Sequence, residues 1–227
     1  MPVPGSEGIA VHLRHSARAR RMSLRVGRAD GRVTLTLPAG MSERQASAFV
    51  RDQAGWVRRA VAAVPARRIV RVGGTVPLLG RDVPIVAGGG RAARYLGETI
   101  AVVDDAQAGP RVRALLQTLA RTHLAAAVDR YAETAGRSPA KLTLRDTRSR
   151  WGSCSSRGDL MFSWRLVMAP PEVLDYVAAH EVAHLLHMDH SPRFWAAVER
   201  LVPDYATHRA WLRTDGATLH AVDFSKE

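Results

Sequence analysis

The stretch HEVAHLLHMDH, residues 180–190, contains four of the nine histidines in the chain. On a helix, residues four apart lie on one face, one turn above the other, so His180 and His184 would present two imidazoles side by side. Glu181 would lie beside this pair, one residue further around the helix. In this HExxH arrangement two neutral imidazoles bind zinc, and the carboxylate takes a proton from the water on the metal. The stretch therefore predicts a helix that carries a catalytic zinc site.

The residues upstream of this stretch also favour a helix. Val173 and Val177 precede His180 at helical spacing, so the face that carries the histidines continues an apolar face. Pro170 or Pro171 is a suitable first residue, because proline is favoured at the first helical position. We expect a helix that begins there and continues through the quoted stretch, with one half of its length in the core and the other half in the site.

A catalytic zinc usually takes three protein ligands and keeps a fourth position for water. His190 lies beyond the point where the sequence MDHSP should break the helix, and a chain that turns there can bring this imidazole back to the metal. His187 lies on the ligand face, but it would be about 4.5 Å further along the axis than His184, which suits a tetrahedral site poorly. Glu199, on a following helix, would give two histidines and one glutamate. The spacing ranks His190 first and Glu199 second, and it leaves His187 as a neighbour of the site.

Length and composition indicate a globular protein. The chain has 227 residues, of which 46% are hydrophobic, enough for one large domain or two small ones. Its one cysteine, Cys154, excludes an intramolecular disulfide and a cysteine-based zinc site, in agreement with a reducing compartment. The sequence shows no signal peptide and no apolar run of the roughly 18 to 20 residues that span a bilayer. We therefore expect a soluble cytoplasmic protein with no membrane association.

The positive charge is concentrated near the N-terminus. The net charge is +12, and residues 1–70 account for +9 of it, with 13 arginines against four acidic residues. Such a basic region could bind nucleic acid, nucleotide phosphates or an acidic partner. The alternative is a solvated arginine-rich surface, and the fact that 31 of the 33 basic residues are arginine could reflect codon bias.

The N-terminal pattern alternates like strands before it becomes helical. Residues 9–37 alternate apolar and polar, and Asp30 with Gly31 would form a hairpin turn. Ser42, followed three residues later by Gln45, is a capping-box pattern. We expect it to open one helix of about 20 residues.

The pattern changes again in the middle of the chain. Residues 69–104 contain short apolar runs separated by glycines, typical of strands and turns, and a long helical pattern then covers residues 110–136. The later run DLMFSWRLVM is strand-like. We place a boundary near residue 107, which gives a β-rich basic region with one helix (1–107) and a catalytic domain (108–227).

Two arginines precede the predicted metal helix. Arg148 and Arg150 alternate along the segment RDTRSRWGSCSSRGDLMFSW, and they could stabilise an oxyanion or bind a phosphate. Alternatively, both could be surface ion-pair partners of Asp146 or Asp159. An extended strand beside a zinc site can also pair with the backbone of a peptide substrate.

Other residues near the motif suit supporting roles. Asp175 and Asp204 could accept the outer N–H of a zinc-bound imidazole. The side chains of Trp151, Trp164 and Cys154 are more typical of packing than of base stacking, metal binding or nucleophilic attack.

Residues 145–195 resemble the YgjP-like family of zinc metallopeptidases, which is related in its motif to the SprT-like and WLM metalloproteases. The resemblance is carried by WGSCS, FSWRLVMAP, YVAAHEVAH and HSPRFW together. The chain departs from the family pattern at Ser163 and Asp189, where asparagine is usual.

This resemblance implies an α+β protein in which a basic, β-rich N-terminal region precedes a zincin-like catalytic domain with an HExxH helix. It implies His180, His184 and His190 as the ligands of Zn²⁺ and Glu181 as the catalytic acid and base. The implied activity is a zinc-dependent metallopeptidase that acts on peptides or proteins.

Two other functions stay open at this point. Some members of the family have been interpreted as nucleoside triphosphate pyrophosphatases acting on UTP, although such enzymes usually need an oxygen-liganded magnesium cluster and the sequence has no dense carboxylate motif. A non-catalytic binding protein could keep zinc for structure, but such a site would not need Glu181.

Overall fold

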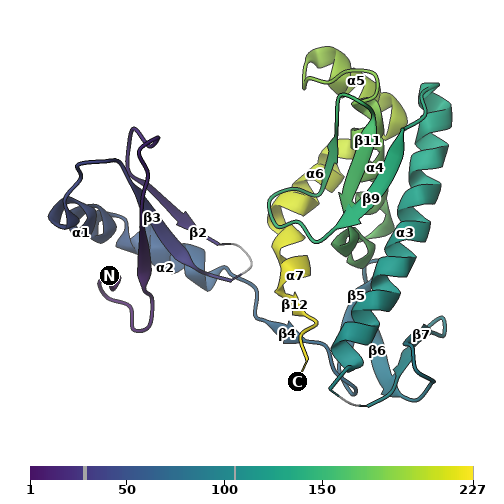
Figure 1. Cartoon of the computed structure of the whole chain (residues 1–227), viewed down its shortest axis with the longest axis horizontal. Helices are drawn as coiled ribbons and strands as arrows, with labels where there is room; N and C mark the ends of the chain where they lie inside the picture. The colour runs from purple at the N-terminus through teal and green to yellow at the C-terminus, as the bar shows by residue number, and fades with distance from the viewer. Residues whose placement is uncertain (28–29, 105, 227) are drawn as a thin grey trace. The chain divides into compact units, whose positions relative to one another are not determined.

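The computed structural model describes residues 1–27, 30–104 and 106–226. The chain divides into two compact units, Met1–Ala66 and Arg67–Glu227 (Figure 1). The boundary therefore lies well before the expected position near residue 107. The strands between residues 68 and 102 belong to the second unit because their apolar side chains share a core with the long helix that follows them.

The first unit is a three-stranded sheet with two helices. Its strands are β1 (Val11–His15), β2 (Ser23–Val26) and β3 (Val33–Leu37), in the order β1-β3-β2. β3 pairs with β1 in parallel and with β2 in antiparallel fashion. The helices α1 (Glu43–Asp52) and α2 (Ala54–Ala62) follow.

The turn between β2 and β3 involves Asp30 and Gly31, as predicted. Gly31 has a φ of 65°, in the left-handed region that glycine adopts without strain. Its N–H donates to the carbonyl of Gly27 at 2.8 Å. The other two residues of this turn, at positions 28 and 29, lie outside the described residues.

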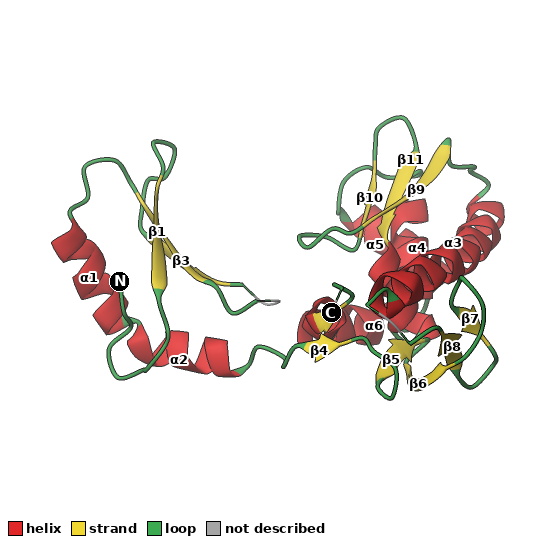
Figure 2. Cartoon of the chain, turned by 60° about the horizontal axis from the view of Figure 1, so that its bottom comes forward, coloured by secondary structure: helices red, strands yellow, loops and turns green. Residues whose placement is uncertain are grey.

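The helical region of the first unit is divided into two helices, whereas the sequence predicted one. The capping box of Ser42 and Gln45 is confirmed, but α1 ends and α2 begins around Gln53. Gly55 follows the junction, and glycine lowers helix propensity. The two helices meet at an angle on the same side of the sheet (Figure 2). This bend lets both helices contribute to the core around β3.

The second unit begins with a four-stranded sheet that packs against a long helix. α3 (Ala108–Ala135) ends at Gly136, which has the predicted left-handed C-cap conformation. In the described ranges, no helix combines the length and the apolar character needed to cross a membrane. The sheet has the order β5-β6-β8-β7, with the strands β5 (Thr75–Leu78), β6 (Arg81–Ala87), β7 (Arg94–Tyr95) and β8 (Ile100–Val102).

A second sheet lies beside the metal-site helix. It contains β9 (Lys141–Arg145), β10 (Gly152–Cys154) and β11 (Asp159–Ser163) in the order β10-β11-β9, so β10 is an edge strand. After β11 the chain forms the 3-10 helix η1 (Trp164–Met168), where a strand was predicted. Most of η1 is buried, and a continuous apolar run does not distinguish a buried strand from a buried helical turn.

Four helices complete the second unit. α4 (Pro171–Ala183) packs against α3, η1 and β10, while α5 (Pro192–Leu201) and α6 (Tyr205–Thr214) contact α4. A helix that carries Glu199 was expected after the metal site, and α5 confirms it, whereas α6 and α7 (Gly216–Ala221) were not expected. The final strand β12 (Val222–Asp223) pairs in parallel with β4 (Arg68–Ile69), which joins the two ends of this unit.

Candidate metal centre and active site

Helix α4 positions the two histidines of the HExxH motif, but it is shorter than predicted. It ends at Ala183, with His184 at the C-cap. The N–H of His184 still donates to the carbonyl of His180 at 3.3 Å, so the two imidazoles keep their helical spacing. Beyond this point the turn tightens, because the N–H of Leu185 bonds to the carbonyl three residues before it, that of Val182.

The chain reverses after α4 and returns His190 to the pair. The Nε2 atoms of His180 and His190 are 3.3 Å apart. The possible ligand atoms of His180, His184 and His190 all lie within 4.8 Å of one another, and no other such group of three occurs in the described part of the chain. Glu199 is exposed on α5, and neither it nor His187 belongs to this group.

The geometry of the three histidines fits a zinc ion. Two nitrogens bound to a tetrahedral zinc at about 2.0 to 2.1 Å lie about 3.3 to 3.4 Å apart, and this separation matches the one between His180 and His190. Nδ1 of His184 lies 3.0 Å from the carbonyl oxygen of His187. An Nδ1–H that donates to this carbonyl leaves Nε2 of His184 available for a metal. His187 thus contributes its backbone to the site.

The imidazoles are held in the neutral form that binds metals. The pKa of His180 is lowered to about 3, chiefly by burial and also by the nearby His184, His190 and Arg209. Burial also lowers the pKa of His184, and the hydrogen bond to the His187 carbonyl opposes this shift. Since only an unprotonated imidazole can coordinate a metal, these two side chains are ready to bind at neutral pH.

Neither of the two carboxylates predicted as outer partners, Asp175 and Asp204, accepts a hydrogen bond from Nδ1 of His180. Nδ1 of His180 is buried and has no hydrogen-bond partner among the described residues. Asp175 instead pairs with Arg130 at 2.7 Å, and Asp204 occupies the N-cap position of α6.

Glu181 lines a cavity of about 480 Å³ beside the histidines. The residue is only 5% exposed, and within the described residues its Oε2 has no hydrogen-bond partner. Burial raises the pKa of Glu181 to about 8, and the positive charge of Arg150 opposes this effect. Glu181 therefore places a mostly buried carboxyl group in the wall of the cavity, next to the histidines.

Strand β10 and the histidine-bearing segment form the two walls of the cavity. Because β10 is the edge strand of its sheet, one side of its backbone is not paired with another described strand. The walls meet where Gly152 lies against Glu181. Residues on the β10 side are Ser149, Arg150, Gly152, Ser153 and Cys154, and Met188 lies on the opposite side.

The two candidate arginines are in different places. Arg150 lines the cavity, and its charge acts on Glu181. Arg148, although described, is not part of the cavity lining, and its charge acts on His220. Alternation along the segment therefore identified one arginine that lies at the site and one that does not.

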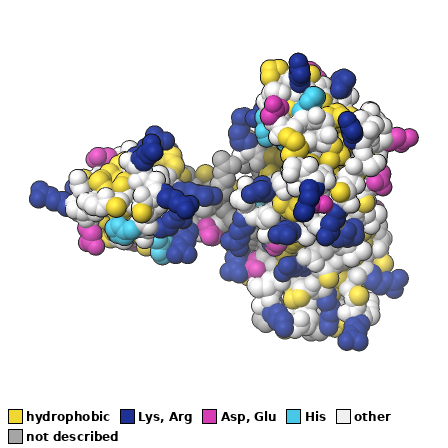
Figure 3. Space-filling view, turned by 45° about the horizontal axis from the view of Figure 1, so that its top comes forward, with side chains coloured by type: hydrophobic (Ala, Val, Ile, Leu, Met, Phe, Trp, Pro, Cys, Tyr) yellow, Lys and Arg dark blue, Asp and Glu magenta, His cyan; other side chains and the backbone are white. Residues whose placement is uncertain are grey.

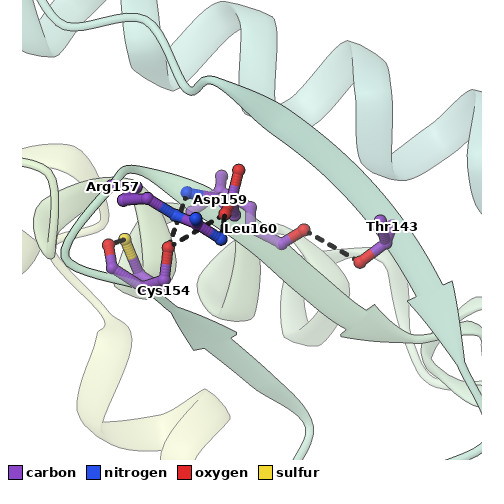
Figure 4. A network of polar contacts seen from close by, with 6 residues as sticks. Thr143, Cys154, Arg157, Asp159 and Leu160 are labelled. Atoms are coloured by element: carbon purple, nitrogen blue, oxygen red, sulfur yellow. Dashed lines mark hydrogen bonds and ion pairs between the residues drawn. The ribbon is translucent and has the colours of Figure 1, made fainter.

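The carboxylates that were considered as partners for these arginines pair with others. Asp146 pairs with Arg165 at 2.7 Å, and Asp159 pairs with Arg157 at 3.3 Å. The backbone N–H of Asp159 also donates to the hydroxyl of Ser155 at 3.1 Å, within the network that closes the turn between β10 and β11 (Figure 4). This network fixes the hairpin that holds β10 at the rim of the cavity.

The two tryptophans near the motif have the expected packing environments, whereas Cys154 is half-buried and lines the cavity. Trp164 is 1% exposed, and Trp151 stacks on His220 with ring centroids 4.8 Å apart. Burial raises the pKa of Cys154 to about 11, so its thiol is protonated at neutral pH. A protonated thiol is a poor nucleophile and a poor metal ligand.

Five residues of the cavity lining were not predicted as site residues: Ser149, Gly152, Ser153, Cys154 and Met188. Gly152 carried a usable signal, because a glycine inside a strand often marks the close approach of another group. Met188 is 53% exposed, unusual for a large apolar side chain, but its sequence position gave no signal.

The comparisons with known proteins include a match to a family model. A family model described as YgjP-like, metallopeptidase domain, matches residues 20–215. No curated protein matches the chain. The chain is similar to a crystal structure of the metallopeptidase zymogen of Pyrococcus abyssi abylysin, with 19% identity and a TM-score of 0.36; the match covers 40% of this chain and 93% of that chain.

Proposed function

The chain belongs to the YgjP-like metallopeptidase family, and we propose that it is a zinc-dependent peptidase whose second unit is a zincin-like catalytic domain. The proposal rests on the group of His180, His184 and His190 beside the buried carboxyl group of Glu181. Three histidines that leave a fourth position open are typical of catalytic zinc rather than structural zinc.

Glu181 is the proposed general base and acid. When bound, zinc supplies Lewis-acid chemistry, which polarises the scissile carbonyl and lowers the pKa of a coordinated water toward about 7. Glu181 accepts the proton of the attacking water and passes it to the leaving amine. The position of Glu181 in the cavity wall beside the three histidines supports the role.

Strand β10 is the proposed binding edge for the peptide. An extended peptide can pair with the free side of an edge strand, which would place its backbone beside the histidines. Arg150 is the better candidate than Arg148 for stabilising the negative oxygen that develops during attack, because Arg150 lines the cavity.

The test is an activity screen of the zinc-loaded chain on a peptide library. Glu181→Gln should retain one zinc per chain and lose hydrolysis by about 10²- to 10⁴-fold, the usual contribution of a general base. Glu199→Gln is a matched control, because this exposed carboxylate lies outside the histidine group and its loss should leave both properties unchanged. Purified protein without stoichiometric zinc, or full activity of Glu181→Gln, would contradict the proposal.

The same screen distinguishes nucleotide hydrolysis. UTP is included as a parallel substrate, with pyrophosphate release as the readout. Pyrophosphate release that is abolished by Glu181→Gln, in the absence of peptide cleavage, would replace the peptidase proposal with a nucleotide pyrophosphatase.

A further inference from the structure

The sheet of the first unit has two chemically different faces. Side chains alternate between the faces of a strand, and Val33, Leu35 and Leu37 of β3 are buried in the core that includes α1 and α2. Thr34 and Thr36 lie between them in sequence and point to the opposite face. The two helices lie on one side of the strands, so they leave this second face uncovered within the unit (Figure 2).

The strand register places basic side chains on both sides of the threonines. In β1 and β2 the residues that pair with Thr34 and Thr36 are exposed and polar. None of the described residues of these strands is acidic, and none is Phe, Tyr or Trp. The two rows across the face are His12, Thr34 and Arg25, and Arg14, Thr36 and Ser23.

Further arginines surround this sheet face. The connection from β1 to β2 runs past the end of β3, where the N–H of Ser16 donates to the carbonyl of Leu37 at 2.9 Å. This connection contributes the exposed side chains of Arg18, Arg20 and Arg21. At the start of β3, Arg32 is also exposed, and its Nη2 lies 3.4 Å from Nδ1 of His12.

The acidic residues of the first unit are too few to balance its cations. The first unit has eleven arginines, no lysine and four acidic residues, and two of those four, Glu43 and Asp52, belong to α1. In the described structure neither Arg14 nor Arg25 pairs with a carboxylate. Arginine side chains project from the surface of this unit (Figure 3).

The excess charge is a property of this unit and does not simply follow from the arginine-rich composition. In the second unit, 17 acidic residues accompany 22 basic ones, so most of the charge is balanced there. In the first unit the ratio is four to eleven. A composition bias alone would raise arginine in both units without removing acidic residues from one.

From this segregation we infer that the exposed face of the β1-β3-β2 sheet binds the phosphate backbone of a nucleic acid. Guanidinium groups bind phosphate oxygens through paired hydrogen bonds, and the hydroxyls of Thr34, Thr36 and Ser23 are further phosphate donors. Because the described strands of this face carry no Phe, Tyr or Trp, they lack the large aromatic side chains on which bases usually stack. The binding should therefore be independent of sequence and dominated by charge.

The inference is tested by fluorescence anisotropy of the full zinc-loaded chain with labelled DNA of random sequence, single-stranded and duplex. We expect a Kd on the order of 10⁻⁴ to 10⁻⁶ M near physiological salt for at least one form, and an affinity that falls steeply with salt. In the double variant Arg14→Gln, Arg25→Gln, the affinity should fall about tenfold, and the magnitude of the salt slope should decrease by about 2.

A matched control separates this face from net charge. The double variant Arg44→Gln, Arg59→Gln removes the same charge from exposed positions on α1 and α2, so it should retain affinity within about threefold. Circular dichroism confirms that both variants are folded. Equal losses in the two variants, no binding to either form of DNA, or equally tight binding of a labelled polyglutamate would each overturn the inference.

Discussion

A Cβ atom built on Gly152 would lie 2.5 Å from Oε1 of Glu181, closer than real Cβ contacts. The same position would lie 2.7 Å from Cγ and 2.8 Å from Cδ of Glu181, so the whole end of this side chain occupies the space. Strand β10 and helix α4 can approach this closely only because residue 152 has no side chain. The glycine thereby sets where the carboxyl group of the proposed base can lie.

Gly152→Ala should therefore reduce peptide hydrolysis without removing zinc. The added methyl group must displace Glu181, since neither the helix nor the strand backbone can yield easily. A misplacement of about 1 Å at a reacting group can cost about 100-fold in rate, so we expect kcat to fall by one to two orders of magnitude. Steady-state kinetics and elemental analysis of zinc on the same preparation measure the two effects.

Gly90→Ala is the matched control for this substitution. Nothing lies within 4 Å of a Cβ at Gly90, and its backbone is outside the positive φ range where an alanine would be strained. This variant should have the activity and the melting temperature of the parent. Unchanged kcat in Gly152→Ala would show that the position of Glu181 does not limit the rate.

The local parts of the site were predictable, because helix geometry alone places His180, His184 and Glu181 together. The position of His190 depended on a chain reversal, which the sequence MDHSP indicated and the structure contains. The contact of Gly152 with Glu181 was not predictable, because it joins a strand and a helix that are distant in sequence. The domain boundary was misplaced for a similar reason, since the shared core of β5 to β8 with α3 leaves no trace in the local periodicity.

The assignment of the third ligand predicts different effects for two neighbouring histidines. His190→Ala removes a side chain that lies 3.3 Å from His180. We expect zinc affinity to fall by at least about 100-fold, which is more than the loss of a residue that only hydrogen-bonds to a metal ligand. His187→Ala keeps the backbone carbonyl that contacts His184, so zinc affinity should change by only a few fold. Competition with a chromophoric chelator measures both constants. Equal affinity losses would mean that the side chain of His187 also takes part.

Arg165 should be important for stability in the second unit. Its side chain is 12% exposed and pairs with Asp146 at 2.7 Å. It also donates to the carbonyls of Leu219 at 2.8 Å and Val222 at 3.0 Å, which fastens α7 and β12 to η1. Arg165→Met leaves these acceptors without their donor and should lower the free energy of unfolding by about 3 kcal/mol.

Urea denaturation of the metal-free protein measures this loss. Arg157→Met is the control, because Arg157 is 85% exposed in its pair with Asp159. Exposed ion pairs contribute about 1 kcal/mol or less. Similar shifts of the unfolding midpoint in the two variants would contradict the structural role of Arg165.

His220 should make the stability of the second unit depend on pH. Its pKa is lowered to about 4, chiefly by burial and then by the charge of Arg165, while Asp146 opposes the shift. In the unfolded chain the same group has a pKa of about 6.5. As the pH falls from about 6.5 to 4, the unfolded chain therefore takes up a proton that the folded chain does not, and the free energy of unfolding decreases. Above this window the contribution of His220 to stability is complete.

His220→Phe isolates this contribution, because phenylalanine can keep the stack on Trp151 and has no ionisable group. We expect the free energy of unfolding of the variant to fall less steeply between pH 7 and pH 5 than that of the parent. His180 and His184 titrate in both proteins, so the difference between the two curves belongs to His220. Urea denaturation of the metal-free proteins at intervals of about half a pH unit gives these curves. Parallel curves would show that His220 is protonated as readily in the folded chain as in the unfolded one.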